Sequence, residues 1–207
     1  MENKENVLIL KKPIMIDGEE TKEINYNITN LTGNHLEEII KDLVKEGYII
    51  TVNYELDPVI EAKIFAEASN RAYMDIQRFY ALDYSKATSL VRAYLFNDNQ
   101  REEKENVIKL GKAINIEGVE ITEVQYDFDK LSGNAIEKVF KEAMQDKYFV
   151  TSSYELDPII AARMFAEAAN IKYEHVKEFE LYDYVKAAAC ARNFFMLGLG
   201  GDQEENN

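Results

Sequence analysis

The chain contains the same five-residue stretch twice. The segment YELDP occupies Tyr54–Pro58 and returns one hundred positions later as Tyr154–Pro158. From this anchor the match extends in both directions without insertion or deletion, and 36 of the 91 positions in Asn6–Phe96 are identical in Asn106–Met196, which is about 40%. Identity at this level over an ungapped window indicates an internal duplication. The chain is therefore predicted to fold as two structural repeats.

Each copy has the size of one small domain, and the segments outside the copies are polar. We expect repeat one over residues 1–96, a charged linker over 97–105, repeat two over 106–197 and a flexible acidic tail over 198–207. A domain of this size buries only a modest core. Docking of the two repeats on each other would let them share apolar surface.

The formal net charge of −14 argues against several classes of partner. Strong acidity opposes binding to phosphate backbones and to anionic membrane surfaces, and no apolar run is long enough to cross a membrane. Hydrophobic residues make up 46% of the chain, too many for a disordered acidic sequence. The single cysteine, Cys190, excludes an internal disulfide and fits a reducing compartment. We expect a folded cytoplasmic protein that binds neither nucleic acid nor membranes.

Each copy is predicted to begin with a β-hairpin. Asp17-Gly18 in copy one and Glu117-Gly118 in copy two each lie between runs in which apolar and polar residues alternate. Asp-Gly between such runs is a strong hairpin signal. Pro13 lacks an N–H donor, so the first strand is expected at the edge of its sheet.

Helices are predicted after each hairpin. Apolar residues at helical spacing follow Leu31 and Leu131. The cap of this first helix is either Thr32, with Leu31 and Leu36 as a hydrophobic staple, or Asn34, with Glu37 closing a capping box. A later helix begins at each Asp-Pro pair. The carboxylate can cap the free N–H groups of the first turn, and proline fits there because its missing N–H would have no partner in the helix. The structural caps are Asp57, Pro58, Asp157 and Pro158.

Two further helices follow in each copy, one short and one long. The fold class is therefore predicted to be α+β and predominantly helical, with two tandem repeats, each a β-hairpin followed by three or four helices. An alanine-rich stretch after each Asp-Pro pair indicates a helix packed closely on more than one side.

The chain offers few candidates for catalysis or metal binding. His35 and His175 are not matched between the copies and lack the spacing of a metal motif, so we interpret them as exposed helix residues. Glu55 and Asp57 could pair as carboxylates at a divalent metal, but a helix cap and an exposed glutamate explain them better. No glycine-rich phosphate loop or nucleophile elbow is present. We predict no catalytic residues, no metal site and no cofactor.

Matched tyrosines are the candidates for a partner-binding surface. Tyrosine suits contact surfaces because it combines a large apolar area with a polar tip. Ordinary half-buried packing is the alternative interpretation of the same pattern. The residues considered are Tyr48, Tyr54, Tyr73, Tyr84, Tyr148, Tyr154, Tyr173 and Tyr184.

Copy one resembles the tail assembly chaperones of tailed bacteriophages. The resemblance is carried by Leu10–Tyr26, with its Leu-Lys-Lys-Pro-Ile opening and Asp-Gly-Glu-Glu turn, and by the Leu31–Asn34 start of an acidic amphipathic helix. The alanine-rich helix and the closing helix over Asp83–Phe96 fit the same family. Copy two fits less closely, and the tandem arrangement departs from the single copy expected of the family.

The resemblance implies a non-enzymatic function. Tail assembly chaperones bind the long, aggregation-prone tape-measure protein and help tail-tube subunits assemble around it. They then leave the finished tail. We therefore expect the tape-measure protein, and the tail-tube protein, as partners in the host cytoplasm, with the chain absent from the virion. The two copies would act as a built-in dimer, and a homo-oligomer is compatible with this arrangement.

Two other classes of function remain open. An acidic nucleic-acid mimic would need carboxylates arrayed along one face, whereas acids here are interspersed with lysines, as in Glu37–Asp42. A structural tail component would differ from a chaperone by being assembled into virions.

Overall fold

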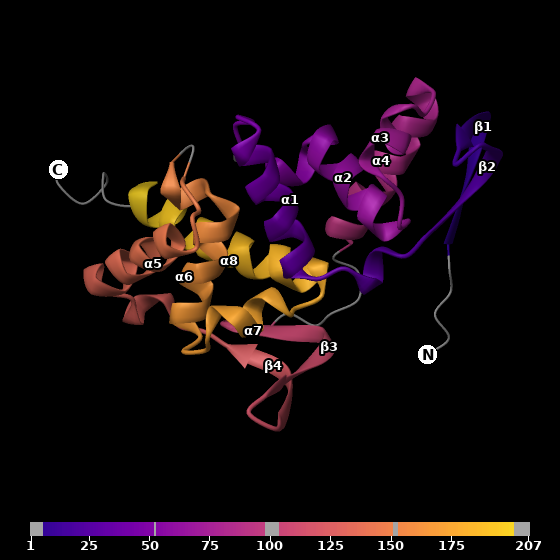
Figure 1. Cartoon of the computed structure of the whole chain (residues 1–207). Helices are drawn as coiled ribbons and strands as arrows, with labels where there is room; N and C mark the ends of the chain where they lie inside the picture. The colour runs from indigo at the N-terminus through magenta and orange to yellow at the C-terminus, as the bar shows by residue number, and fades with distance from the viewer. Residues whose placement is uncertain (1–5, 52, 98–103, 151–152, 201–207) are drawn as a thin grey trace.

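The computed structural model describes residues 6–51, 53–97, 104–150 and 153–200. It confirms an α+β, predominantly helical fold built from two repeats, each a β-hairpin followed by helices (Figure 1). Repeat 1 contains β1 (Asn6–Ile16), β2 (Glu19–Tyr26), α1 (Gly33–Lys45), α2 (Pro58–Ala68), α3 (Tyr73–Gln77) and α4 (Ala81–Leu95). Repeat 2 contains β3 (Val107–Ile116), β4 (Val119–Gln125), α5 (Gly133–Gln145), α6 (Pro158–Ala168), α7 (Tyr173–Lys177) and α8 (Leu181–Gly200).

The hairpins form where their turn residues predict them. Asp17 and Gly18 have φ angles of 53° and 84°, and Glu117 and Gly118 have 52° and 88°. Positive φ at both central residues is the geometry of a two-residue hairpin turn that matches the twist of the strands. The register of β1 and β2 shifts between Ile9 and Ile14, around Pro13, in a two-stranded sheet where both strands are edges.

A buried aspartate ties each hairpin to the last helix of its repeat. The Asp83 carboxylate, on α4, accepts hydrogen bonds from the backbone N–H groups of Lys11 (2.8 Å) and Lys12 (3.2 Å). Asp183, on α8, accepts one from the N–H of Gly111 at 2.8 Å. Both side chains are fully buried. The bonds satisfy strand donors at the register shift, where the ladder between strands is interrupted.

The helix starts follow the local sequence. Asp57 accepts hydrogen bonds from the N–H groups of Val59 and Ile60, and Asp157 does the same in repeat 2. Each carboxylate also accepts a bond from a tyrosine hydroxyl, Tyr48 at 2.8 Å and Tyr148 at 2.7 Å. At the first helix the structure selects the threonine cap of the two alternatives. Thr32 is the N-cap, its N–H donates to His35 Nδ1, and Ser132 takes the same position in repeat 2.

The alanine-rich helices α2 and α6 lie at the centres of their repeats. Phe65 and Phe165 are fully buried, and each packs against the tyrosine that ends the hairpin region, Tyr26 or Tyr126, with ring centroids 5.2 Å apart. Helix α2 packs on α1, α3 and α4, and α6 packs on α5, α7 and α8. Small residues on several faces permit this close approach from several sides.

The two repeats dock through non-equivalent surfaces. Helix α1 of repeat 1 packs against α7 and α8 of repeat 2, and α4 also contacts α8. The equivalent pairing of α5 with α3 and α4 does not occur among the described residues, since these helices lie at opposite ends of the molecule (Figure 1). The contact is therefore heterologous: each repeat uses a different face.

Some boundaries differ from the prediction. Helix α8 continues through Gly198 to Gly200, so the first part of the predicted flexible tail is helical, because a long helix gains one backbone bond for each residue it adds. A 3-10 turn at Tyr54–Leu56 precedes α2. Most of the predicted linker, 98–103, lies outside the described residues. None of the helices within the described ranges has the length and apolar character needed to cross a bilayer.

Candidate functional site

A buried polar cluster lies where α1 meets α7 and α8. The Tyr173 hydroxyl donates to Glu37 Oε2 at 2.6 Å, and its oxygen lies 3.1 Å from the Tyr184 hydroxyl. Glu37 is 3% exposed and also pairs with Lys41. Burial, reinforced by the charge of Glu37, raises the pKa of both tyrosines well above the ordinary value. These phenols stay protonated at neutral pH and act as hydrogen-bond donors that hold the two repeats together.

The backbones of the two repeats also meet directly. Gly33, the first residue of α1, donates its N–H to the carbonyl of Phe179 at 3.0 Å, and the Leu181 N–H donates to the carbonyl of Leu31 at 2.9 Å. The ring of Tyr184 lies against Gly33 so closely that a Cβ atom there would be 2.1 Å from Tyr184 Cδ2. Only glycine permits this approach.

An ion pair lies at the other end of the contact between the repeats. Arg192, on α8, pairs with Glu55, and its guanidinium carbon lies 4.9 Å from the centre of the Tyr54 ring. In repeat 1 the equivalent Arg92 pairs with Glu61 through two bonds of 2.7 and 2.8 Å. Position 161 in repeat 2, which corresponds to Glu61, is alanine. The same arginine therefore binds within its own repeat in one copy and across the boundary in the other.

An apolar groove of about 450 Å³ runs beside this ion pair. Its walls come from the turn before α2, the end of α4 and the outer face of α8. Leu56, Phe96 and Met196 line it while remaining 46%, 57% and 52% exposed. Apolar side chains that gather around one hollow and stay exposed mark a candidate binding site. We call this hollow, lined by Leu56, Phe96, Met196 and Tyr182, the boundary groove.

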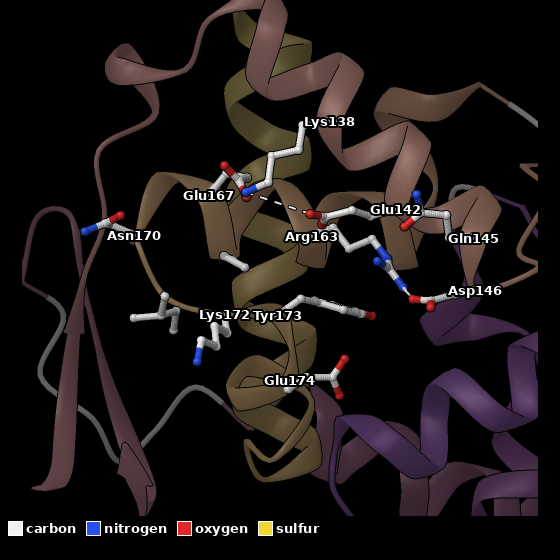
Figure 2. A pocket seen from close by; sticks show the side chains of 12 residues that line it. Lys138, Glu142, Gln145, Asp146, Arg163, Glu167, Asn170, Lys172, Tyr173 and Glu174 are labelled. Atoms are coloured by element: carbon white, nitrogen blue, oxygen red, sulfur yellow. Dashed lines mark hydrogen bonds and ion pairs between the residues drawn. The ribbon is translucent and has the colours of Figure 1, made fainter. Parts of the chain in front are cut away.

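A second hollow, of about 470 Å³, is polar and lies between α5, α6 and α7 (Figure 2). Figure 2 shows its charged side chains directed at one another: Lys138 binds Glu167, and Arg163 binds Asp146. The Arg163 guanidinium also lies 4.1 Å from the centre of the Tyr173 ring, which connects this hollow to the buried cluster. The charges are paired within the protein. In the described part of the chain, no three His, Cys, Asp or Glu residues are grouped to hold a metal ion.

The eight candidate tyrosines divide into two sets. Four are buried: Tyr54, Tyr173 and Tyr184 at the boundary between the repeats, and Tyr148 beneath the α6 cap. These four serve packing inside the chain. Tyr48, Tyr73, Tyr84 and Tyr154 keep exposed area, and contact with a partner through them stays a prediction.

Two sequence interpretations are wrong. His35 and His175 were expected to be exposed, but both are half-buried, and His35 Nδ1 accepts a hydrogen bond from the Thr32 N–H. Glu55 was expected to be an exposed glutamate, but it is 8% exposed and carries the ion pair with Arg192. Its counterpart Glu155 is half-buried and hydrogen-bonded to Ser153. Arg92 and Arg192, which occupy equivalent positions on the last helix of each repeat, both form salt bridges.

Sequence reasoning missed Gly33 and Glu37 as contact residues. Both are identical in the two copies, and that identity was the available signal. It could not reveal which copy of each residue is covered, because the covering surface belongs to the other repeat.

No protein family, curated protein or solved structure matches the chain.

Proposed function

We propose that the chain is a non-catalytic assembly chaperone of the kind found in tailed bacteriophages, and that its client is an apolar helical segment of the tape-measure protein. The boundary groove is the observation that carries this proposal. It presents three large exposed apolar side chains, Leu56, Phe96 and Met196, contributed by both repeats. A groove of this kind suits the apolar face of an amphipathic helix, whose anchors at i, i+3 and i+4 would lie along it.

The charge of the chain supports the same function. A net charge of −14 keeps a complex with an aggregation-prone client dispersed through mutual repulsion. Glu55 and Arg192 also line the groove, and they are paired with each other, so the apolar side chains are the part of the wall open to a client.

The acidic-decoy alternative gains no support from the side-chain arrangement. Carboxylates on α1 and α5 pair with lysines one turn away, as in Lys45 with Asp42 at 2.8 Å and Lys141 with Glu137 at 3.1 Å. A mimic of a phosphate backbone would need an uninterrupted row of negative charge.

Co-expression with the tape-measure protein of the same phage or prophage tests the proposal. We expect the client to remain soluble and to co-purify with the chain. Phe96→Glu should reduce the amount retained about tenfold, the effect of removing a central aromatic anchor. Phe149→Glu is the matched control, because Phe149 is 62% exposed but lies outside the groove.

Three outcomes would count against this function. A client that is equally insoluble with and without the chain would contradict the chaperone hypothesis. Equal loss of client in both phenylalanine variants would remove the groove as the binding site. Recovery of the chain from purified virions would identify a structural tail component instead.

A further inference from the structure

The contact between the repeats leaves two complementary faces without a partner. Helix α1 with the turn before α2, which we call the donor face, docks on α7 and α8, which we call the acceptor face. Repeat 2 has its own donor face on α5, and repeat 1 has its own acceptor face on α3 and α4. These two lie at opposite ends of the molecule and cannot meet within one chain (Figure 1).

The residues that build the internal contact are retained on the free faces. The donor residues are Gly33, Glu37, Tyr54 and Glu55, and the acceptor residues are Tyr173, Phe179, Tyr184 and Arg192. All eight counterparts are identical, although only 36 of 91 aligned positions are. The counterparts are Gly133, Glu137, Tyr154, Glu155, Tyr73, Phe79, Tyr84 and Arg92.

Several of these counterparts are far more exposed than the residues of the internal contact. Gly133 has nothing within 4 Å of the position of a Cβ atom, and its backbone does not need glycine. Glu137 has a side chain that is 69% exposed, whereas that of Glu37 is 4% exposed. Tyr154 is 36% exposed, against 1% for Tyr54. No atom of its own repeat requires glycine at position 133. An aromatic ring from another molecule, packed there as Tyr184 packs on Gly33, would explain why glycine is retained.

The backbone groups of the free faces also match. Gly133 and Ala81 are the first residues of α5 and α4, where N–H groups have no partner within their own helix. Their counterparts Gly33 and Leu181 use those N–H groups to join the two repeats. The free faces can therefore form the same two backbone bonds.

We propose that the free donor face of one chain docks on the free acceptor face of a second copy, so that the protein assembles head to tail. The contact is heterologous, so each added chain leaves one donor and one acceptor face open, and assembly continues until a ring closes or a filament forms. The proposal does not depend on the identity of a client.

The contact between chains should be weaker than the internal one. Two apolar acceptor residues of repeat 2, Leu181 and Val185, correspond to Ala81 and Ser85 in repeat 1. Arg92 is held by Glu61, whereas Arg192 is available to Glu55. The internal contact also benefits from the covalent link between the repeats. Repulsion between chains of charge −14 opposes association and is screened by salt. Assembly should therefore rise with protein concentration and with ionic strength.

Sedimentation of the full chain over a range of concentrations and salt tests the proposal. We expect an average mass that grows past that of two chains as concentration rises. Gly133→Leu should block the donor face, because the leucine side chain would occupy the place of the Tyr84 ring. Ala81→Glu should block the acceptor face, because Leu181, its counterpart, is fully buried in the internal contact. Both positions are exposed in the single chain, so folding should be retained.

Mixing the two variants gives the decisive result. Each variant alone should remain a single chain, but Gly133→Leu keeps an acceptor face and Ala81→Glu keeps a donor face. An equimolar mixture should therefore form a species of two chains and nothing larger. The control Ala93→Glu adds the same charge to the exposed side of the same helix and should assemble like the native chain.

Three results would overturn the proposal. The native chain could stay a single chain at every concentration and salt tested. Its mass could stop at two chains, which indicates a symmetric dimer. Assembly could persist in Gly133→Leu or Ala81→Glu to the same extent as in the control.

Discussion

At the scale of single residues, the same amino acid has different structural roles in the two repeats. Gly33 lies under the ring of Tyr184, whereas Gly133 faces open space. Arg192 reaches Glu55 in the other repeat, whereas Arg92 binds Glu61 in its own. The duplication thus supplies a matched control within the chain for each residue at the boundary.

Gly33→Ala should destabilise the docking of the repeats, since the added methyl group would overlap the Tyr184 ring. Overpacking of this kind costs about 1–3 kcal/mol. Gly133→Ala should change the free energy of unfolding by less than about 0.5 kcal/mol, as expected for an exposed site. Urea denaturation of both variants measures the difference. Equal effects at the two positions would show that the described contact does not form.

The aspartate caps should differ in strength between the repeats. Asp57→Ala should lower the free energy of unfolding by about 1 kcal/mol, the usual cost of losing a cap, and Asp57→Asn should retain most of it. Asp157→Ala should cost more, because Asp157 is 2% exposed and its loss leaves the buried Tyr148 hydroxyl without its acceptor. Thermal denaturation of the three variants checks the order. A milder effect at Asp157 would contradict it.

At the scale of elements, each hairpin is held to its repeat by a buried carboxylate on the last helix. The sheets have two strands each, and a lone hairpin is marginal in water. The bonds from Lys11, Lys12 and Gly111 to Asp83 and Asp183 therefore anchor the strands to the helical part. The groups involved lie about 70 residues apart, which explains why sequence patterns did not reveal them.

Asp183→Ala should loosen the second hairpin. The Gly111 N–H would lose its acceptor in a partly buried position, at a cost of about 1–3 kcal/mol. Hydrogen exchange should become faster across β3, while protection in α5 should change little. Asp183→Asn, which keeps an oxygen acceptor, is the control. Unchanged exchange in β3 of the alanine variant would show that the carboxylate does not hold the strand.

At the scale of the whole molecule, the two repeats are joined by a contact rich in buried phenol groups. Burial raises the pKa of Tyr54, Tyr148, Tyr173 and Tyr184 above the ordinary value near 10. In the unfolded chain these groups would ionise near pH 10. The folded chain therefore binds more protons above that pH, and the free energy of unfolding must fall as pH rises.

Alkaline unfolding is the expected consequence. Stability should be intact below about pH 10 and should decline above it by about 1.4 kcal/mol per pH unit for each buried tyrosine. Tyrosinate absorbance and circular dichroism should be followed together. They should show that the buried tyrosines ionise only as the helices are lost. Tyr184→Phe should make the decline shallower. Full tyrosine ionisation in a chain that stays helical would contradict this.

Much of the fold within each repeat was predictable because its signals are local. The hairpin turns required residues that tolerate positive φ, the Asp-Pro pairs marked helix starts, and the apolar spacing marked the helices. The end of α8 was misjudged because a glycine-rich sequence can remain helical when a long helix precedes it. The choice between Thr32 and Asn34 as cap was open until the geometry was known.

The sequence by itself determined that there are two repeats, what elements they contain and that they share one architecture, because these depend on identity and on contacts a few residues apart. Only the tertiary structure decided how the repeats meet. The internal contact joins Gly33, Glu37 and Glu55 to residues more than one hundred positions away. Both repeats carry the same donor and acceptor residues, so the sequence is nearly symmetric, whereas one covalent chain can satisfy only one of the two possible pairings.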